Sequence, residues 1–124
     1  MSKKNILVFG SNGLVGSSCV RILSDSKKVS NVISSTRKDT NLFNYIDTKK
    51  KILESKPDVV IIAAAKVGGI LANNTYRTEF LIENLKINMN ILESLIDFPE
   101  IQIINLGSSC IYPLNAQNPL KEDY

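Results

Sequence analysis

Four short apolar runs along the chain mark the strands that the sequence predicts. The runs over residues 5–9 and 58–64 are almost unbroken, and residues 29–35 form a weaker one. Residues 101–106 form the last run, whose isoleucines predict a buried strand. Apolar runs of this length without polar alternation are typical of strands in a parallel sheet that is covered on both faces.

Stretches with helical spacing of apolar residues separate these runs. Residues 14–23 and 45–54 predict two helices, and a Ser-Lys-Pro sequence ends the second. Residues 78–96 predict a long amphipathic helix. Its expected apolar face consists of Phe80, Leu81, Leu85, Met89, Leu92 and Ile96. Residues 67–75, with their glycines and asparagines, and the residues from 111 onward are expected to be loops.

The order β-α-β-α-β-α-β predicts an α/β fold with a doubly wound parallel sheet of the Rossmann type, because parallel strands need crossover connections. The 124 residues, 44% hydrophobic and 22% charged, suit one globular domain. The sheet would be truncated after the fourth strand, with no following helix to cover it. We therefore expect residues 1–124 to be the N-terminal part of a dinucleotide-binding domain, with the remainder of the sheet and the substrate domain absent.

Charge and unusual residues narrow the possible functions. The net charge of +3 is mild, and the lysine run at residues 49–51 is better explained by a solvated helix face than by nucleic-acid binding. No segment reaches the roughly 20 apolar residues of a membrane span, and no signal peptide is apparent. We therefore expect a cytoplasmic protein that binds neither nucleic acid nor membrane. The chain has no His and two cysteines, Cys19 and Cys110, which argues against a metal site and a disulfide framework.

Three glycines follow the first strand in the sequence Gly-Ser-Asn-Gly-Leu-Val-Gly. In this variant of the dinucleotide fingerprint, Gly10 would allow a tight turn, Gly13 the approach of a pyrophosphate and Gly16 close packing of the next helix. The N–H groups at the helix start favour phosphates. A plain turn is the alternative, but the strand before the loop and the helix after it favour nucleotide binding. The expected cofactor contacts are Gly10, Ser11, Asn12, Gly13, Leu14, Val15 and Gly16.

The end of the second strand predicts which dinucleotide binds. An NAD-binding fold usually has an acid there for the ribose hydroxyls, whereas this chain has Arg37 and Lys38 and no acid before Asp39. Two cations suit a 2′-phosphate, to which Arg37 could make charge-assisted contacts. An ordinary exposed basic turn is the alternative. The sequence therefore predicts NADP(H) rather than NAD(H).

The last predicted strand leads into Ser108, Ser109 and Cys110. Ligands bind at the carboxyl ends of parallel strands, so these hydroxyls and the thiol are candidates for chemistry. A thiol can act as an acid or a base because its unperturbed pKa of about 8.5 lies near neutrality. The alternative is that Cys110 is a small buried apolar residue, which the residues alone favour. Cys19, within the first helix, is expected to pack.

Several blocks together resemble one family over essentially the whole chain. They are the glycine loop, the Ala-Ala-Ala-Lys-Val-Gly-Gly-Ile sequence at 63–70, the pair Asn73-Asn74 and the Leu-Gly-Ser-Ser-Cys-Ile-Tyr-Pro sequence at 106–113. The chain is similar to the extended short-chain dehydrogenase/reductase family, and in particular to members that epimerise and reduce a GDP-linked keto sugar. The glycine loop is general to that family, whereas the other blocks are far more specific.

This resemblance implies an NADP(H)-dependent enzyme, homodimeric at full length, that epimerises C3 and C5 of GDP-4-keto-6-deoxy-D-mannose and reduces its C4 keto group. Ser108 would bind the keto oxygen and Cys110 would act in epimerisation, while Asn84 would support the active site. Beyond the glycine loop, the implied cofactor contacts are Arg37, Asn41, Leu42, Ala63, Ala64, Ala65 and Lys66. The implied substrate contacts are Val67, Gly68 and Ser109, and no metal is expected.

Some positions depart from the family pattern. Asn44 and Asn12 replace an acid and an arginine found in relatives, so the NADP preference depends mainly on Arg37. The family's Tyr-x-x-x-Lys pair is expected to be absent, because Tyr112 is followed by Ala116 at the lysine position and Tyr124 is the last residue.

The chain alone is therefore expected to be inactive. Two alternatives stay open: another nucleotide-sugar epimerase or dehydratase of the same family, and a non-catalytic dinucleotide-binding fragment.

Overall fold

The computed structural model describes residues 3–108 and 111–123. Its elements, in chain order, are β1 (Lys4–Phe9), α1 (Leu14–Ser24), β2 (Val29–Ser35), α2 (Tyr45–Ser55), β3 (Val59–Ile62), α3 (Ile70–Thr75), α4 (Arg77–Leu95) and β4 (Gln102–Asn105). The predicted α/β class, the predicted strands and the three predicted helices are confirmed. Within this part of the chain, no helix has both the length and the hydrophobicity of a membrane span.

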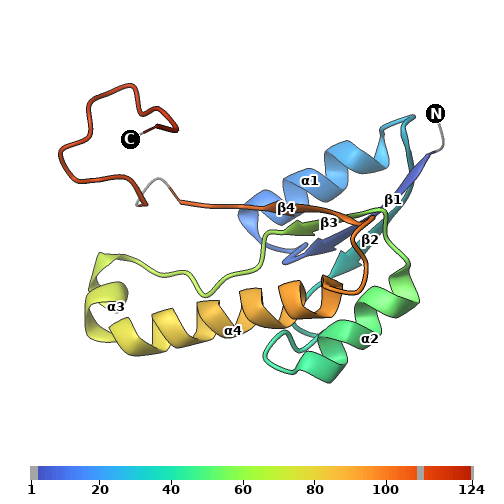
Figure 1. Ribbon diagram of the computed structural model, residues 1–124, viewed down its shortest axis with the longest axis horizontal. Coiled ribbons are helices and arrows are strands. Elements are labelled where there is room, and N and C mark those ends of the chain that lie inside the picture. Colours follow the sequence, from blue (N-terminus) through green and yellow to red (C-terminus); the bar gives the residue numbers. More distant parts are fainter. Residues whose placement is uncertain (1–2, 109–110, 124) are drawn as a thin grey trace.

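All strand pairs are parallel, and the strands lie in the order β2-β1-β3-β4. The chain moves from β1 outward to β2 and then crosses back over β1 to β3 and β4. Right-handed crossovers that change direction must place their helices on opposite faces. Accordingly, α1 covers one face of the sheet, while α2 and α4 lie together on the other (Figure 1).

Two apolar cores form because successive side chains of a strand point to opposite faces. On one face, buried residues of β1 and β3 pack with α2 and α4. This core contains Leu7, Phe9, Ile52, Val60, Ile62, Ile87, Ile91 and Leu95. On the other face, the buried residues are Ile6, Val8, Val59 and Ile61, with Val20 and Leu23 of α1 packed against them. Covering on both faces explains why β1 and β3 are apolar at almost every position.

The prediction of burial for the last strand is wrong, because every residue of β4 is exposed. Ile103 and Ile104 keep 39% and 41% of their surfaces accessible. β4 pairs with β3 at one edge, and no described element follows it to cover its remaining surface. An apolar sequence shows that a strand can be buried, but burial itself requires a neighbour.

The predicted apolar face of the long helix is also wrong. Most of that face points to solvent, and the exposed residues, at 42–73% of their surfaces, are Leu81, Leu85, Met89, Leu92 and Ile96. The residues buried against the sheet and α2 are Ile87, Ile91, Ser94 and Leu95. Helix α4 therefore has two apolar stripes, and the sequence pattern cannot decide which of them faces the sheet.

The segment 67–75, predicted to be a loop, contains the short helix α3. Hydrogen bonds from side chains close this turn: Asn73 Nδ2 donates to the carbonyls of Gly68 and Gly69 at 2.8 and 3.1 Å. Thr75 Oγ1 donates to the carbonyl of Leu71 at 2.8 Å. Asparagine and threonine favour turns through such bonds, and the same bonds close this helical turn. No residue of α3 is buried.

Candidate functional site

The loops that follow the parallel strands gather at one edge of the sheet. The glycine loop follows β1, residues 36–44 follow β2, and residues 63–69 follow β3. β1 and β3 are neighbours, but the connection after β1 runs outward to β2 whereas the connection after β3 runs the other way to β4. The two connections therefore lie on opposite faces of the sheet. In open α/β sheets, the crevice at such a point is where ligands bind. Ser108 lies after β4 at the same edge, since all four strands are parallel.

The glycine loop, residues 10–16, lies in close contact with the loop after β3. Gly10 has a φ of +77°, a backbone conformation that side chains disfavour. A Cβ at this position would lie 2.5 Å from the carbonyl oxygen of Ala63 and 2.8 Å from Cα of Ala64. The N–H groups of Gly10 and Ser11 donate to the carbonyl of Ser35 at 2.9 and 3.2 Å. The backbone of this turn therefore links the ends of β1, β2 and β3.

The start of α1 is open to an anion. Gly13 caps the helix without a side-chain hydrogen bond, and the first turn has no acidic residue. A Cβ on Gly16 would collide with the carbonyl oxygen of Gly10, so a glycine is required for this close packing. Leu14 and Val15 are 90% and 48% exposed, which is unusual for apolar residues. The backbone N–H groups of a first helical turn have no partner within the helix and can bind a diphosphate.

The turn after β2 is closed by its own acidic residue. Asp39 Oδ2 accepts hydrogen bonds from the N–H and the hydroxyl of Thr36 at 2.8 and 2.6 Å. These bonds hold the pKa of Asp39 below its ordinary value. Arg37 is exposed at this turn, and no carboxylate in the described residues lies within 4.0 Å of its guanidinium. The turn thus presents a cation while its acid is engaged locally.

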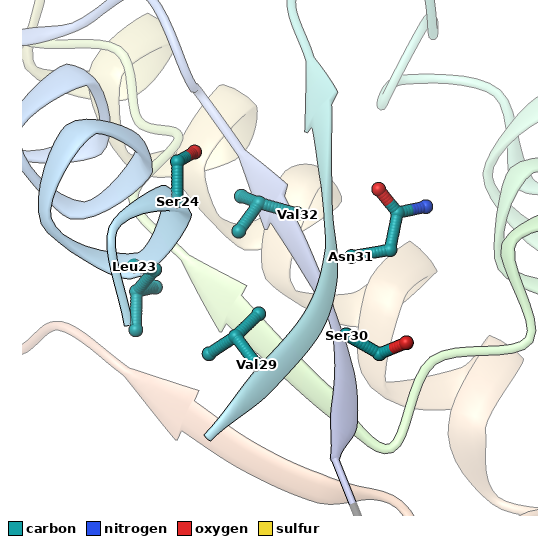
Figure 2. A pocket seen from close by; sticks show the side chains of 6 residues that line it. All are labelled: Leu23, Ser24, Val29, Ser30, Asn31 and Val32. Carbon is teal, nitrogen blue, oxygen red and sulfur yellow. The ribbon is translucent and has the colours of Figure 1, made fainter. Parts of the chain in front are cut away.

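Two surface hollows lie near β2. One, of about 320 Å³, separates the loop 36–44 from α2. Its lining, which mixes both charge signs, consists of Arg37, Lys38, Asp39, Thr40, Asn41, Asp47, Lys50, Lys51 and Glu54. The other, of about 210 Å³, lies at the amino-terminal half of β2, where Leu23 of α1 faces Val29 and Val32 (Figure 2). None of the predicted site residues lines this second hollow.

Helix α4 holds the loop after β3. Asn84 Oδ1 accepts from the backbone N–H of Lys66 at 2.8 Å, and Asn84 Nδ2 donates to the carbonyl of Lys66 at 3.0 Å. The Lys66 ammonium pairs with Glu83 and lies 5.2 Å from the ring centroid of Phe80. A Cβ on Gly68 would lie 2.8 Å from Phe80 Cζ, so this glycine packs against the ring. The ammonium of Lys66 is thus engaged by α4.

The remaining predicted residues are spread around the same edge. Ala63 and Ala64 are half-buried, and Ala65 and Val67 are exposed. Ser108 is exposed, and its carbonyl accepts from the N–H of Ile111 at 3.3 Å. Ser109 and Cys110, predicted to act on the substrate, lie outside the described residues.

A Tyr-x-x-x-Lys spacing does occur in the chain, at Tyr45 and Lys49 of α2, and the absence of the family's own pair stays a prediction. Lys49 Nζ donates to Tyr45 Oη at 3.0 Å and to Asp97 at 3.4 Å, and these bonds raise the pKa of Lys49. Asp97 follows the end of α4, just before β4 begins. The contact thus ties Lys49 to the segment between α4 and β4, whereas Tyr45 begins α2 directly after the loop that follows β2.

Sequence reasoning also missed the contact between Asn90 of α4 and the loop after β2. Asn90 Nδ2 donates to the carbonyl of Leu42 at 2.8 Å. The only signal available was the presence of a polar residue among apolar ones on a long helix. Such a residue could equally face solvent, so the pattern alone did not indicate the contact.

The sheet order, the switch point between the neighbouring strands β1 and β3, and the glycine loop define a Rossmann-type α/β domain whose loop suits a dinucleotide. The chain belongs to the NAD dependent epimerase/dehydratase family, whose model matches residues 6–124. The resemblance found in the sequence is thereby confirmed.

Individual relatives support this assignment. GDP-L-fucose synthase 1 of Arabidopsis thaliana is 41% identical over 124 residues, covering 98% of this chain and 38% of that protein. GDP-L-colitose synthase of Yersinia pseudotuberculosis is 35% identical over 119 residues, covering 95% and 38%. A GDP-D-glycero-L-gluco-heptose synthase from Campylobacter jejuni, solved in the presence of NADPH, has a TM-score of 0.87 at 31% identity, covering 100% and 36%. The chain thus spans little more than a third of these relatives.

Proposed function

We propose that the protein uses NADP(H) to convert GDP-4-keto-6-deoxy-D-mannose to GDP-L-fucose, by epimerisation at C3 and C5 and reduction of the C4 keto group. One observation carries this proposal. The two sequence blocks most specific to the resemblance, 63–70 and 106–113, follow the adjacent strands β3 and β4 at the edge where the glycine loop lies. The match to GDP-L-fucose synthase 1 of Arabidopsis thaliana covers 98% of the chain.

The residues at this edge fit a dinucleotide with a 2′-phosphate. The glycine loop leaves the start of α1 without a capping side chain and without an acid, as a diphosphate requires. Among the described residues no carboxylate pairs with Arg37, so its guanidinium would form charge-assisted hydrogen bonds with the 2′-phosphate. Asn41 and Leu42 would line the adenine end. Residues 63–66 would pass beneath the centre of the cofactor, with Lys66 contributing its backbone.

The proposed chemistry uses the acidity of hydrogens beside a ketone. Cys110 would act as the acid or base on one face of C3 and of C5, and a second acid–base group on the opposite face would complete the proton exchange that inverts each carbon. Ser108 would donate its hydroxyl to the C4 oxygen and stabilise charge there in both stages. Val67, Gly68 and Ser109 would contact the sugar nucleotide. When bound, NADPH supplies the hydride for C4.

The proton for the C4 oxygen would come from the family's tyrosine. Lys49 of the Tyr45–Lys49 pair is held by Asp97, in the segment between α4 and β4, so we do not assign this pair the role. We therefore expect residues 1–124 alone to bind part of the cofactor without catalysing the reaction.

The test uses the complete protein encoded by the gene (the gene-encoded protein), incubated with NADPH and the keto sugar in deuterated water. We expect NADPH oxidation, formation of GDP-L-fucose and deuterium at C3 and C5. Cys110→Ser should lose the deuterium incorporation while its NADPH dissociation constant stays unchanged. Unchanged incorporation in the variant would remove Cys110 from the mechanism, and a failure of the parent protein to oxidise NADPH would refute the function itself.

A homodimer and a cytoplasmic setting complete the proposal. Helix α4 exposes an apolar stripe formed by Leu81, Leu85, Met89, Leu92 and Ile96. A second copy of the chain packed on this stripe would remove it from water. The proposed acid–base role of Cys110 needs a thiol, and thiols persist in a reducing compartment.

A second candidate is a related GDP-sugar reaction. It is favoured by the 35% identity to GDP-L-colitose synthase over 119 residues. Turnover of the GDP-L-colitose precursor in preference to GDP-4-keto-6-deoxy-D-mannose would select it. Binding of NADPH without turnover of either sugar would instead indicate a non-catalytic module.

A further inference from the structure

Two asparagines of α4 each hold a different loop of the candidate cofactor site. Asn84 binds both backbone groups of Lys66 in the loop after β3, at 2.8 and 3.0 Å. Six residues further along, Asn90 binds the carbonyl of Leu42 in the loop after β2, at 2.8 Å. We propose that Asn90 is a positioning residue for the 2′-phosphate of the dinucleotide. This inference rests on the proposed NADP(H) function.

The other side-chain hydrogen bonds of the loop 36–44 are local. Ser35 Oγ donates to Thr40 Oγ1 at 2.9 Å, and Asp39 closes its turn with Thr36. Asn41 Oδ1 accepts from the N–H of Phe43 at 3.1 Å. Local bonds of this kind fix the shape of a loop but leave its place on the domain open.

Contacts from outside the loop set that place. At its start, the carbonyl of Ser35 accepts from the glycine loop. Further along, the Leu42 side chain packs against the apolar core, a contact that has no preferred direction. The hydrogen bond from Asn90 joins residues 48 positions apart. It constrains the position of the Leu42 carbonyl relative to α4 and the direction in which that carbonyl points. Asn90 thus adds a directional constraint that apolar packing does not supply.

The position of this loop matters because Arg37 depends on it. Arg37 is exposed and has no ion pair in the described part of the chain that would orient it. A guanidinium binds a phosphate best through paired N–H groups of fixed geometry. A shift of the loop relative to α4 would carry Arg37 away from a 2′-phosphate whose place the glycine loop and the β3 loop determine. NADH lacks that phosphate, so its binding would change less.

The expected effect is therefore on selectivity rather than on binding in general. Asn90→Ala removes the donor to the Leu42 carbonyl. The expected cost is comparable to the net free energy of one hydrogen bond. We expect Asn90→Ala to reduce the preference for NADPH over NADH by roughly fivefold to tenfold. Asn84→Ala disturbs the loop that both dinucleotides share, so it should weaken both by the same factor.

Asn88 provides the matched control on the same helix. Asn88 Nδ2 donates to the carbonyl of Asn84 at 2.9 Å, and its Oδ1 is buried without a hydrogen-bond partner in the described structure. Asn88 makes no hydrogen bond to either loop, so Asn88→Ala should change stability without changing the ratio of the two dissociation constants. Asn90→Leu, which keeps most of the volume and lacks the donor, replaces Asn90→Ala if that variant does not fold.

The experiment measures dissociation constants for NADPH and NADH by fluorescence titration of the gene-encoded protein and its variants. The inference is supported if the ratio changes for the Asn90 variant and stays constant for Asn84→Ala and Asn88→Ala. It is overturned if the Asn90 variant weakens both dinucleotides equally or matches Asn88→Ala. A parent protein that binds neither dinucleotide refutes the proposed function. One that binds both equally refutes the 2′-phosphate assignment, and the inference fails with either.

Discussion

Replacing Gly10 by alanine tests how the site is built. The φ of +77° costs an alanine about 1–2 kcal/mol, since side chains crowd the backbone in this region. The new Cβ would lie 2.5 Å from the Ala63 oxygen, and its three nearest atoms all belong to backbone, which cannot rotate away as a side chain can. Overpacking of this kind adds about 1–3 kcal/mol. We expect a loss of about 2–5 kcal/mol, set against the roughly 5–15 kcal/mol that stabilises a domain.

The assay is urea denaturation of the parent protein, Gly10→Ala and the control Gly69→Ala. A Cβ on Gly69 meets nothing within 4 Å, and its φ of −70° suits alanine. We expect the control to lie within about 0.5 kcal/mol of the parent. NADPH binding should fall only for Gly10→Ala, since opening the contact between β1 and the loop after β3 displaces the glycine loop. Equal denaturation midpoints for the two variants would show that the backbone relaxes freely and that our steric reasoning fails.

Three further predictions concern charge and association. Arg37→Ala should weaken NADPH binding by about tenfold or more and NADH binding little, in a titration with both; a uniform loss would refute the 2′-phosphate contact. The pKa of Asp39 is lowered, so its bonds to Thr36 persist at neutral pH and break only as the pH falls below the ordinary value of 3.8, which the amide shift of Thr36 should report by NMR. A transition at or above that value would contradict the assignment. Leu85→Glu, in the exposed apolar stripe, should shift the gene-encoded protein from dimer to monomer in sedimentation, without loss of helix content; an unchanged mass would exclude this surface.

Much of the fold follows from local pattern. The nearly unbroken apolar run at residues 5–9 predicted β1, and residues 29–35 match β2 at both ends. Glycine at position 10 predicted a turn that a side chain would block, which the contact with Ala63 bears out. These features depend on neighbours in sequence or on properties that one residue carries by itself, so the sequence contains them directly.

Other features depend on neighbours that are distant in sequence. The apolar sequence of β4 predicted burial, yet burial needs a covering element. The stripe through Leu85 was the more regular apolar face of α4, whereas the face through Ile91 is the one packed on the sheet. The role of Asn90 could not be predicted, because its partner Leu42 lies 48 residues away.

The sequence by itself determined the α/β class, the glycine loop and the family, because spacing, glycine geometry and family motifs are local properties. Only the tertiary structure decided which face of α4 is buried, that the Lys66 ammonium is paired with Glu83, and that α4 holds the loops after β2 and β3 through Asn84 and Asn90. The physical reason is that side-chain pairing and burial are set by the packing of whole elements. A pattern within one element constrains that packing without choosing the partner.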